Sequence, residues 1–590
     1  MGHRVPIHIT TQSYAIDTNY SHYTDLMIHD GVLFATTRFD GNFEAWDISG
    51  SGLSRFDTAS HRRADVAGSD VHLISAVLNG QDVIIASGGA SNALQYIKLR
   101  DNGDMHGRND IGYVPLWGGD IGDMASVTLA SGETVIYGAI TTGGGIGSFT
   151  LQPDATLVGT DLHLGLGAGS GDTVVAVEVV SIGGAEFLLS LSDNETGFST
   201  WVIGAAGGLT QTDSVDPQRH LWITAPTALA TAQVGDETYA ILAAAGSASL
   251  TVARITGAGA IEVTDHVLDN GYTRFDDVQA VATARYGDLT YVVAGGSDGG
   301  ISVFVLGPDG RLYEQGSLAD SAATAMAHVS AIEVAATASG LDIFVASSSE
   351  FGITRLHYDL DGGGNLIVAS TGGSLSGTAG TDFLFGGEGN DALSGGAGGD
   401  ILVDGAGVDS LTGGAGSDTF VFVADGQADR VTDFDPNADR LDLSQWSMLR
   451  DPSDLTVTGI ANGFRIIFGD ETLDVLSEDW GTTTIQSLAH NLILGVDRVD
   501  LDNSDSGGSP TGPFVNYGTS GDDILVAPDR PSHLYGGEGD DLVIGSSEDD
   551  ELYGDAGADT IYGQGGNDVI HGGAGDDIIY LGDGWGDPLA

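Results

Sequence analysis

The chain has 590 residues, 83 of them acidic and 20 basic, which gives a formal net charge of −63. Because it contains no cysteine, disulfides and thiolate-based zinc sites are excluded. Nucleic acids and anionic lipid surfaces are polyanions, so we expect neither to be a direct partner of so acidic a chain. With 41 % hydrophobic residues, the chain has enough apolar material for several folded domains.

The N-terminal segment contains no sign of export or membrane insertion. Residues 1–17 include no apolar stretch long enough for a cleaved signal peptide. No window of the sequence reaches the roughly 18 apolar residues that a membrane helix requires. We therefore expect no membrane insertion, and we expect any export to proceed without a cleaved N-terminal signal.

A long repeat organises the first 370 residues. An alternating apolar run recurs at successive spacings of 51, 52, 52, 52, 51 and 52 residues. The runs begin at Phe43, Leu94, Ile146, Phe198, Leu250, Ile301 and Ile353. Each period holds four short strand-like segments separated by turns with Gly or Asp, which is typical of one blade of a β-propeller. We predict a seven-bladed ring over residues 1–370, since an elongated β-solenoid or separate sandwiches fit this unit less well.

A propeller ring also has to be closed. Residues 5–16 precede the first blade and have strand character. We expect them to supply the outer strand of the seventh blade and so tie the two ends of the ring together. The alternative is that the seventh blade closes with its own residues 365–370, NLIVAS.

From Gly377 onward the period is nine residues. Five copies span 377–421 and seven span 518–580. Position six is Asp in eleven of these twelve copies, with Ser532 as the exception, and position eight is always apolar. Glycines allow tight turns that present carbonyl oxygens, and the Asp carboxylate points into the same turn. These are the ligands that Ca²⁺ prefers, so we predict a parallel β-roll that holds several Ca²⁺ ions; without calcium the alternative is a disordered tail.

The nonapeptides resemble the RTX (repeats-in-toxin) β-roll motif GGxGxDxUx, in which U is apolar. Residues 413–444 resemble the cap that follows the roll in serralysin-type secreted proteases. The resemblance implies that four aspartates of this segment help to end the calcium stack, namely Asp429, Asp433, Asp435 and Asp439. It also implies export by a type I secretion machinery that reads an uncleaved C-terminal signal. No HExxH motif is present, which excludes a serralysin-like zinc protease.

The predicted metal ligands are the repeat aspartates, one cap aspartate and the glycines that open several repeats. They are Asp382, Asp391, Asp400, Asp409, Asp418, Asp433, Asp523, Asp541, Asp550, Asp559, Asp568, Asp577, Gly386, Gly395, Gly413, Gly536, Gly563 and Gly572. The repeat at 527–535 departs from the motif, since prolines and an arginine replace its glycines, and so does the segment 546–548. Calcium sites beside these two segments are therefore in doubt.

The predicted fold class is all-β, with two rolls that follow the propeller and are separated by a small cap. We place the first roll and the start of its cap at 371–445, the β cap with a short helix near 482–494 at 446–502, a flexible linker at 503–517 and the second roll at 518–590. Three cap strands are expected, with the sequences LTVTGI, GFRIIF and ETLDVL.

The loops between blades contain the candidate ligand-binding residues of the propeller. They are Arg62, Arg63, Arg219, His220, Trp222 and Arg274. Arginines and aromatic side chains on one rim suit an anionic or sugar-like ligand, although inter-blade loops also collect such residues without a function. His22, His72 and His328 precede the first strands of three neighbouring blades, where they form either an acid–base or metal cluster or simply three surface histidines.

Two hypotheses about function follow. The first is a secreted, extracellular or cell-surface calcium-binding protein whose propeller recognises a glycan, a cell surface or a self-assembly partner. The second is a secreted hydrolase or lyase, lactonase-like or polysaccharide-directed, with its active site at the propeller channel. Residues 295–312 look like a blade of lactonase-type propellers, but no catalytic constellation stands out in the sequence, so enzymatic activity stays open.

Overall fold

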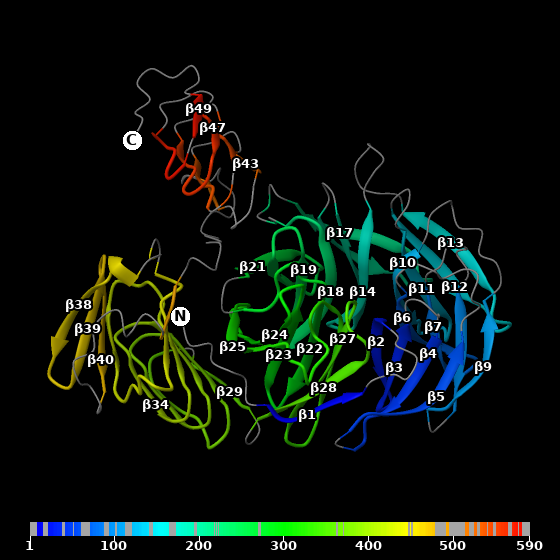
Figure 1. Ribbon diagram of the computed structural model, residues 1–590. Coiled ribbons are helices and arrows are strands. Elements are labelled where there is room, and N and C mark those ends of the chain that lie inside the picture. Colours follow the sequence, from blue (N-terminus) through cyan, green and yellow to red (C-terminus); the bar gives the residue numbers. More distant parts are fainter. Residues whose placement is uncertain are drawn as a thin grey trace. The chain divides into compact units, whose positions relative to one another are not determined.

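The computed structural model is all-β, with seven antiparallel sheets followed by two parallel rolls (Figure 1). Among the described residues, no helix is long and apolar enough to cross a membrane. The chain divides into two compact units, Met1–Leu501 and Asp502–Ala590. The described residues are 9–15, 22–37, 42–50, 52–60, 71–87, 94–100, 103–111, 121–140, 145–163, 173–193, 197–216, 219, 221, 223–269, 273–360, 364–369, 371–446, 449, 452–477, 491–494, 514–517, 524–527, 532–537, 539, 541–546, 550–563, 569–575 and 577–580.

Seven four-stranded sheets form the predicted propeller blades, coloured blue to green in Figure 1. The first strand of each blade packs against the first strands of both neighbouring blades, so these strands surround the axis of the ring. In blade order the strands are β2 Tyr23–His29, β3 Val32–Thr37, β4 Asn42–Asp47, β5 Ser54–Ser60; β6 Leu73–Leu78, β7 Gln81–Ala86, β8 Gln95–Leu99, β9 Met105–Asp110; β10 Ile121–Thr128, β11 Thr134–Ile140, β12 Ile146–Leu151, β13 Leu157–His163; β14 Val174–Ile182, β15 Ala185–Ser192, β16 Phe198–Ile203, β17 Leu209–Val215; β18 Pro226–Val234, β19 Glu237–Ala244, β20 Ser249–Ile255, β21 Ile261–Leu268; β22 Ala280–Tyr286, β23 Leu289–Gly295, β24 Gly300–Leu306, β25 Leu312–Ala319; and β26 Val329–Ala336, β27 Gly340–Ser347, β28 Ile353–Asp359.

In blades 1 and 2, a two-residue turn with positive φ joins the first strand to the second. Asp30 and Gly31 join β2 to β3 with φ of 49° and 76°, and Asn79 and Gly80 join β6 to β7 with φ of 55° and 74°. Positive φ at both central residues matches the right-handed twist of the flanking strands, which is why Asp-Gly and Asn-Gly are favoured there. This turn chemistry therefore fixes the register of these two hairpins.

The ring is closed by its N-terminal strand, which confirms the prediction for residues 5–16. Strand β1, Ile9–Ala15, pairs antiparallel with β28, with Ser13 opposite Arg355, so blade 7 consists of β1, β28, β27 and β26. Side chains also join blade 7 to blade 1. Ser330 Oγ donates to the carbonyl of Tyr23 at 2.8 Å, and Arg355 donates to the carbonyls of Gly50 and Gly52. The alternative closing segment 365–370 instead contributes a strand to the first roll.

The first roll consists of two sheets of parallel strands, coloured yellow-green in Figure 1. Successive strands of one sheet lie one coil apart, so Phe383 pairs with Ile401 and Leu393 with Leu411. Position eight of each repeat faces inward and is fully buried, as at Leu402. One sheet contains β29 Leu366–Val368, β31 Phe383–Glu388, β33 Ile401–Ala406, β35 Thr419–Val421, β37 Arg440–Asp442 and β41 Leu492–Ile493; the other contains β30 Ser374–Ser376, β32 Ala392–Ala397, β34 Ser410–Ala415, β36 Ala428–Val431 and the cap strands.

The three expected cap strands are β38 Thr456–Ile460, β39 Gly463–Phe468 and β40 Glu471–Leu476, preceded by the 3-10 turn η2 at Pro452–Asp454. They extend the second sheet of the roll, because β40 pairs with β36. Most of the helix expected near 482–494 falls outside the described residues. Its last part was predicted wrongly, since Leu492–Ile493 forms β41, whose pairing with β37 continues the roll.

The first roll shares a hydrophobic core with blades 6 and 7. The outward-facing side chains Phe383, Ile401, Val403 and Val421 pack in one cluster with residues of these blades. The rings of Tyr313 and Phe383 meet edge to face, with centroids 5.1 Å apart. Two polar contacts add to this core: Arg440 donates to the carbonyl of Glu314 at 3.0 Å, and the amide of Asp288 donates to the carbonyl of Gly364 at 2.9 Å.

The second unit is another parallel roll, coloured orange to red in Figure 1. Its core is a row of position-eight residues such as Leu534, Val543 and Ile561, all fully buried. An aromatic ladder runs along one sheet, since Tyr535, Tyr553 and His571 stack with centroids 4.6 Å apart. One sheet contains β42 Phe514–Tyr517, β44 Ser532–Tyr535, β46 Glu551–Tyr553 and β48 Val569–His571, and the other β43 Ile524–Val526, β45 Leu542–Ile544, β47 Thr560–Tyr562 and β49 Ile578–Tyr580.

Candidate metal centres and the propeller channel

A ladder of hydrogen bonds connects the repeat aspartates of successive coils. The amide of Asp382 donates to Oδ1 of Asp400 at 2.8 Å, and the amide of Asp400 donates to Oδ1 of Asp418 at 2.9 Å. The other row of turns repeats this pattern, since the amide of Asp391 donates to Oδ1 of Asp409 at 2.6 Å. Each pair is 18 residues apart, which is two nonapeptides, so position six places every carboxylate under the turn of the preceding coil.

Among the described residues of the first roll, five aspartates have an Oδ2 atom that is buried and lacks a hydrogen-bond donor. This holds for Oδ2 of Asp391, Asp400, Asp404, Asp409 and Asp418. Burial raises the pKa of Asp400 to about 8, and it raises the pKa values of Asp409 and Asp418 to about 6. A buried carboxylate without a donor is costly unless a cation accompanies it. The residues therefore fit calcium, which prefers such oxygens.

The glycines that open the repeats leave room for these carboxylates. A Cβ at Gly536 would lie 2.5 Å from Oδ2 of Asp541, and one at Gly572 would lie 2.6 Å from Oδ2 of Asp577. At Gly395 and Gly413 the nearest atoms likewise include the Oδ2 of the aspartate in the same repeat. Gly386 differs, since its Cβ would meet the carbonyl of Asp404 in the next coil, and Gly563 donates its amide to Tyr580.

The ends of the first stack are closed by hydrogen bonds. Asp382 Oδ1 accepts from the amide and side chain of Asn365, and its Oδ2 accepts from the hydroxyl of Thr378 at 2.8 Å. At the other end, Asp433 accepts from the amides of Gly413 and Gly414 at 3.0 and 2.8 Å. These two predicted ligands thus have donors on both oxygens and cap the stack through the backbone.

In the second roll the same ladder continues where the repeat motif is intact. The amide of Asp541 donates to Oδ1 of Asp559 at 2.8 Å, and that of Asp559 donates to Asp577 at 3.1 Å. Asp550 lies beside the irregular segment 546–548, and its Oδ2 accepts from the amide and hydroxyl of Ser546 at 2.6 and 3.1 Å. Ser546 thus donates to the Oδ2 position that, in Asp391, Asp400, Asp409 and Asp418 of the first roll, has no donor among the described residues. Asp523 and Asp568 lie outside the described residues.

Sequence reasoning missed Asp404 as a ligand candidate. It occupies position one of its repeat, where the motif has glycine, and its carboxylate lies with those of Asp409 and Asp429, with one oxygen of each within 4.8 Å of the others. All three residues are buried. The departure from glycine at this position was the signal in the sequence, and the neighbourhood of Asp429 required the structure.

The innermost strands of the propeller carry four acidic side chains that the sequence analysis also missed. Asp25, Asp123, Glu178 and Glu333 lie on β2, β10, β14 and β26, the innermost strands of blades 1, 3, 4 and 7. Burial raises their pKa values, to about 6 for Asp25, about 7 for Glu333 and about 8 for Glu178. The charges of Asp123 and Glu333 raise the pKa of Glu178 further. Acidic residues within otherwise apolar first strands were the signal in the sequence.

Three of these acids connect neighbouring blades. Asp25 accepts from the amide of Leu73 at 2.6 Å, Asp123 from that of Val177 at 2.9 Å, and Glu333 from that of Ile28 at 3.1 Å, each on the inner strand of another blade. Within the described part of the chain, Glu178 has no such hydrogen bond. His72 lies 3.9 Å from Asp123, which places one histidine near the channel carboxylates.

The predicted loop site is described only in part. Arg62, Arg63, His220 and Trp222 lie outside the described residues. Arg219 pairs with Asp213 at 2.6 Å, and Arg274 lies 3.7 Å from the carboxylate of Asp298 and donates to its carbonyl at 3.1 Å. Arg219 and Arg274 therefore each lie beside an aspartate of the propeller itself. Their role in ligand binding stays a prediction.

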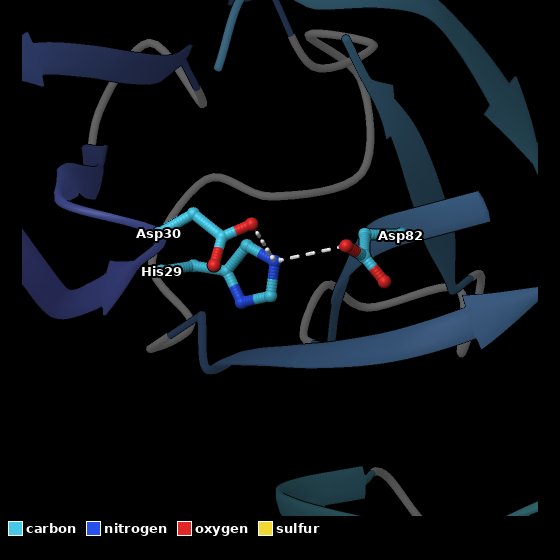
Figure 2. Close-up of side chains that lie close together, drawn as sticks. All are labelled: His29, Asp30 and Asp82. Atoms are coloured by element: carbon cyan, nitrogen blue, oxygen red, sulfur yellow. Dashed lines mark ion pairs between the residues drawn. The ribbon is translucent and has the colours of Figure 1, made fainter. Parts of the chain in front are cut away.

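The three histidines singled out in the sequence do not form a metal group in the described structure. His22 packs against Phe351 with centroids 4.5 Å apart, and His72 is the one that lies near Asp123. A different histidine, His29, lies 3.7 Å from Asp30 and 3.6 Å from Asp82 (Figure 2). Because Asp30 is 83 % exposed and Asp82 48 %, we interpret this group as surface ion pairing.

One family model and several solved structures are similar to parts of this chain. The RTX calcium-binding nonapeptide repeat matches four times, at 369–402, 394–422, 517–552 and 553–584. No curated protein matches the chain. A putative 6-phosphogluconolactonase from Bacteroides uniformis ATCC 8492 is similar at 12 % identity and a TM-score of 0.38, and the alignment covers 50 % of this chain and 85 % of that one. A protein from Lactobacillus plantarum is similar at the same identity and TM-score, over 52 % of this chain and 87 % of that one. The computationally designed Ika8 protein matches at 12 % identity and a TM-score of 0.36, over 59 % of this chain and 98 % of that one.

Proposed function

We propose that this chain, which carries RTX calcium-binding nonapeptide repeats behind a seven-bladed propeller, is exported by a type I machinery and folds its tail on extracellular calcium. The observation that supports this most is the row of buried Oδ2 oxygens without donors at Asp391, Asp400, Asp409 and Asp418. Folding these turns without a cation leaves several uncompensated carboxylates in a low-dielectric interior. Cation binding and folding are therefore one process.

This coupling makes the folding of the tail depend on whether the chain is inside or outside the cell. In a calcium-poor cytosol the carboxylates repel one another and keep the tail expanded, as an exporter that threads unfolded chains requires. Outside the cell, millimolar calcium stabilises the folded state in proportion to the logarithm of its concentration above the dissociation constant. Part of the net charge of −63 is then ligand charge that bound ions neutralise.

Export and calcium binding are tested with the full-length chain. Bacterial cells that carry a type I transporter should release it into the medium, and cells without the transporter should retain it. Calcium-depleted protein should then gain β-structure by circular dichroism when calcium is added, with several ions bound per chain by atomic emission. Retention in both strains would refute the export proposal, and a chain that binds no calcium would refute the folding proposal.

For the propeller we propose a recognition role at a cell surface, in a matrix or in self-assembly. Support comes from its ring, which is closed by β1 and joined from blade to blade by the carboxylates of Asp25 and Glu333, which accept from backbone amides of neighbouring blades. A rigid ring that presents loops from seven blades is a scaffold suited to recognition. Binding of the full-length protein to an array of anionic and neutral polysaccharides tests this role, and the absence of any binding would count against it.

A second candidate function is acid–base catalysis in the channel, by a hydrolase or lyase. The observation that favours it is Glu178, a carboxyl without a hydrogen-bond partner among the described residues, whose pKa is raised to about 8 beside Asp123 and Glu333. Acids whose pKa lies near the working pH are suited to proton transfer. Full-length protein is assayed against lactones and acidic polysaccharides, with Glu178→Gln as the variant. Activity that the variant retains in full would exclude Glu178 from the reaction.

A further inference from the structure

Position one of the nonapeptide is glycine for a steric reason. At seven such glycines, a Cβ would lie within 2.9 Å of the Oδ2 atom of the aspartate at position six of the same repeat. These glycines are Gly377, Gly395, Gly413, Gly536, Gly545, Gly554 and Gly572. Ala527 also departs from glycine at this position, and its repeat is the one with Ser532 in place of the aspartate. A side chain at position one therefore competes with the carboxylate at position six.

Asp404 does not follow this relationship. Its repeat, DGAGVDSLT, has an aspartate at position one and also keeps Asp409 at position six. Both are buried, at 1 % and 2 % exposure, and a third carboxylate joins them from the cap segment, that of Asp429 at 7 %. One carboxylate oxygen of each lies within 4.8 Å of the other two. Two ligands of the same calcium ion are at most about 4.8 Å apart at a Ca–O distance of 2.4 Å, so the three can share one ion.

The hydrogen bonds hold this group in place without neutralising it. Asp404 Oδ1 accepts from the amides of Gly405 at 2.6 Å and Val423 at 3.0 Å. Asp429 Oδ1 accepts from the amide of Asp409 at 2.9 Å. The Oδ2 atoms of Asp404 and Asp409 are buried, and no described residue donates a hydrogen bond to them. Among the described residues, no arginine or histidine forms an ion pair with any of the three.

We propose that Asp404, Asp409 and Asp429 bind one Ca²⁺ through three carboxylates, in a site that is tighter than the other calcium sites of the first roll and fills first. This inference rests on the proposed calcium binding of the tail and goes beyond the repeat motif, which has no side chain at position one. Calcium affinity rises with the number of charged ligands and with the rigidity of the site. In the described part of the two rolls, no other three acidic residues come this close together.

The site also links the roll to its cap. Asp404 belongs to β33 and Asp409 precedes β34, whereas Asp429 is part of β36, which pairs with the cap strand β40. An ion shared by the three joins the last regular coils to the strand on which the cap is built. Filling this site first therefore orders the junction of roll and cap before the remaining turns take up calcium.

The test is a calcium titration of full-length, calcium-depleted protein by isothermal calorimetry. Wild type should show one tight binding step before the others. Asp404→Gly restores the glycine that ten of the other eleven repeats have at position one. The variant should keep calcium-dependent folding but weaken the tightest step by at least about tenfold. Asp236→Asn, on an exposed propeller turn, removes the same charge elsewhere and should leave that step unchanged.

Asp404→Asn guards against a folding defect in the glycine variant. Asparagine keeps an acceptor for the amides of Gly405 and Val423 but removes the charge, and it should weaken the same step. If both variants retain the wild-type tight step, or if wild type binds all its calcium with one affinity, the three-carboxylate site is wrong while calcium-driven folding stands. If wild type binds no calcium, the proposed function itself fails.

Discussion

The amide of Asp382 donates to Oδ1 of Asp400, 2.8 Å away and 18 residues later in the chain. This contact shows how the two carboxylate oxygens of a repeat aspartate differ in their surroundings. One carboxylate oxygen satisfies the backbone of the preceding coil, while the other, Oδ2, is buried without a donor. The same aspartate is thus both a structural acceptor and a ligand, so the fold and the cation stabilise each other.

Asp400→Asn separates these two roles. The amide oxygen of asparagine still accepts from the Asp382 amide, but its NH₂ group replaces the ligand oxygen. We expect the variant to fold at a higher calcium concentration and to bind at least one ion fewer than wild type, as measured by circular dichroism and calorimetry. Asp470→Asn, an exposed cap residue, is the matched control. Unchanged stoichiometry in Asp400→Asn would remove Asp400 from the ligand set.

The irregular repeat of the second roll can be repaired. Ser532 already donates its amide to Oδ1 of Asp550 at 2.7 Å, as the repeat aspartates do, but it offers no carboxylate. Ser532→Asp combined with Ala527→Gly should therefore lower the calcium midpoint for folding. Ser532→Asp alone should do less, because the Ala527 methyl group occupies the space that the new carboxylate needs. Equal midpoints for the double variant and wild type would argue against this steric account.

The shared core predicts that the first roll depends on the propeller. Phe383 is fully buried and meets the ring of Tyr313 edge to face. Phe383→Ala should destabilise the first roll by about 3–5 kcal/mol, measured as a lower unfolding temperature at saturating calcium. Val368→Ala is the control, since Val368 lies in the same sheet but is 51 % exposed. Similar effects of the two variants would show that Phe383 does not contribute through this core.

The stability of the propeller should fall with rising pH because of Glu178. Its pKa is raised from 4.5 to about 8, so the protonated form is the one that stabilises the fold. That contribution is complete below pH 4.5 and is lost as the pH rises to about 8. Glu178→Gln should flatten this dependence and raise the melting temperature at pH 8 by about 2–4 °C or more, with little change at pH 4.5. Parallel pH profiles of wild type and variant would contradict the assignment.

The architecture could be predicted because both of its building units are sequence repeats of constant length. The spacing of the blade repeat and the nine-residue repeat each recur many times, so single deviations do not hide them. Ring closure by the N-terminal strand was expected from the strand character of residues 5–16, and the pairing of β1 with β28 decides between it and the alternative segment 365–370. The docking of the first roll on blades 6 and 7 was not foreseen, although apolar outward positions at Phe383 and Ile401 contrast with Ser410 and Thr412 on the other sheet.

The candidate sites were less predictable, because they depend on neighbours from distant repeats. The aspartates at position six were found, yet the end residues Asp382 and Asp433 prove to have donors on both oxygens, which the motif does not reveal. Asp404 was not recognised because its partner Asp429 lies 20 residues after Asp409, where the 18-residue spacing of the regular coils no longer holds. Glu178 was not recognised as a candidate because a single acid in an apolar strand becomes notable only when the ring places it beside Asp123 and Glu333.

Hydrogen exchange of the full-length chain, with and without calcium, tests the central claim most directly. In excess chelator, amides of Asp382, Asp391 and Asp400 should exchange rapidly, while those of strands β23 and β24 in blade 6 stay protected. With millimolar calcium the repeat amides should become as protected as the propeller strands, because their acceptors are the same carboxylates that bind the ion. Equal protection of the repeats in chelator and in calcium would contradict calcium-driven folding of the roll.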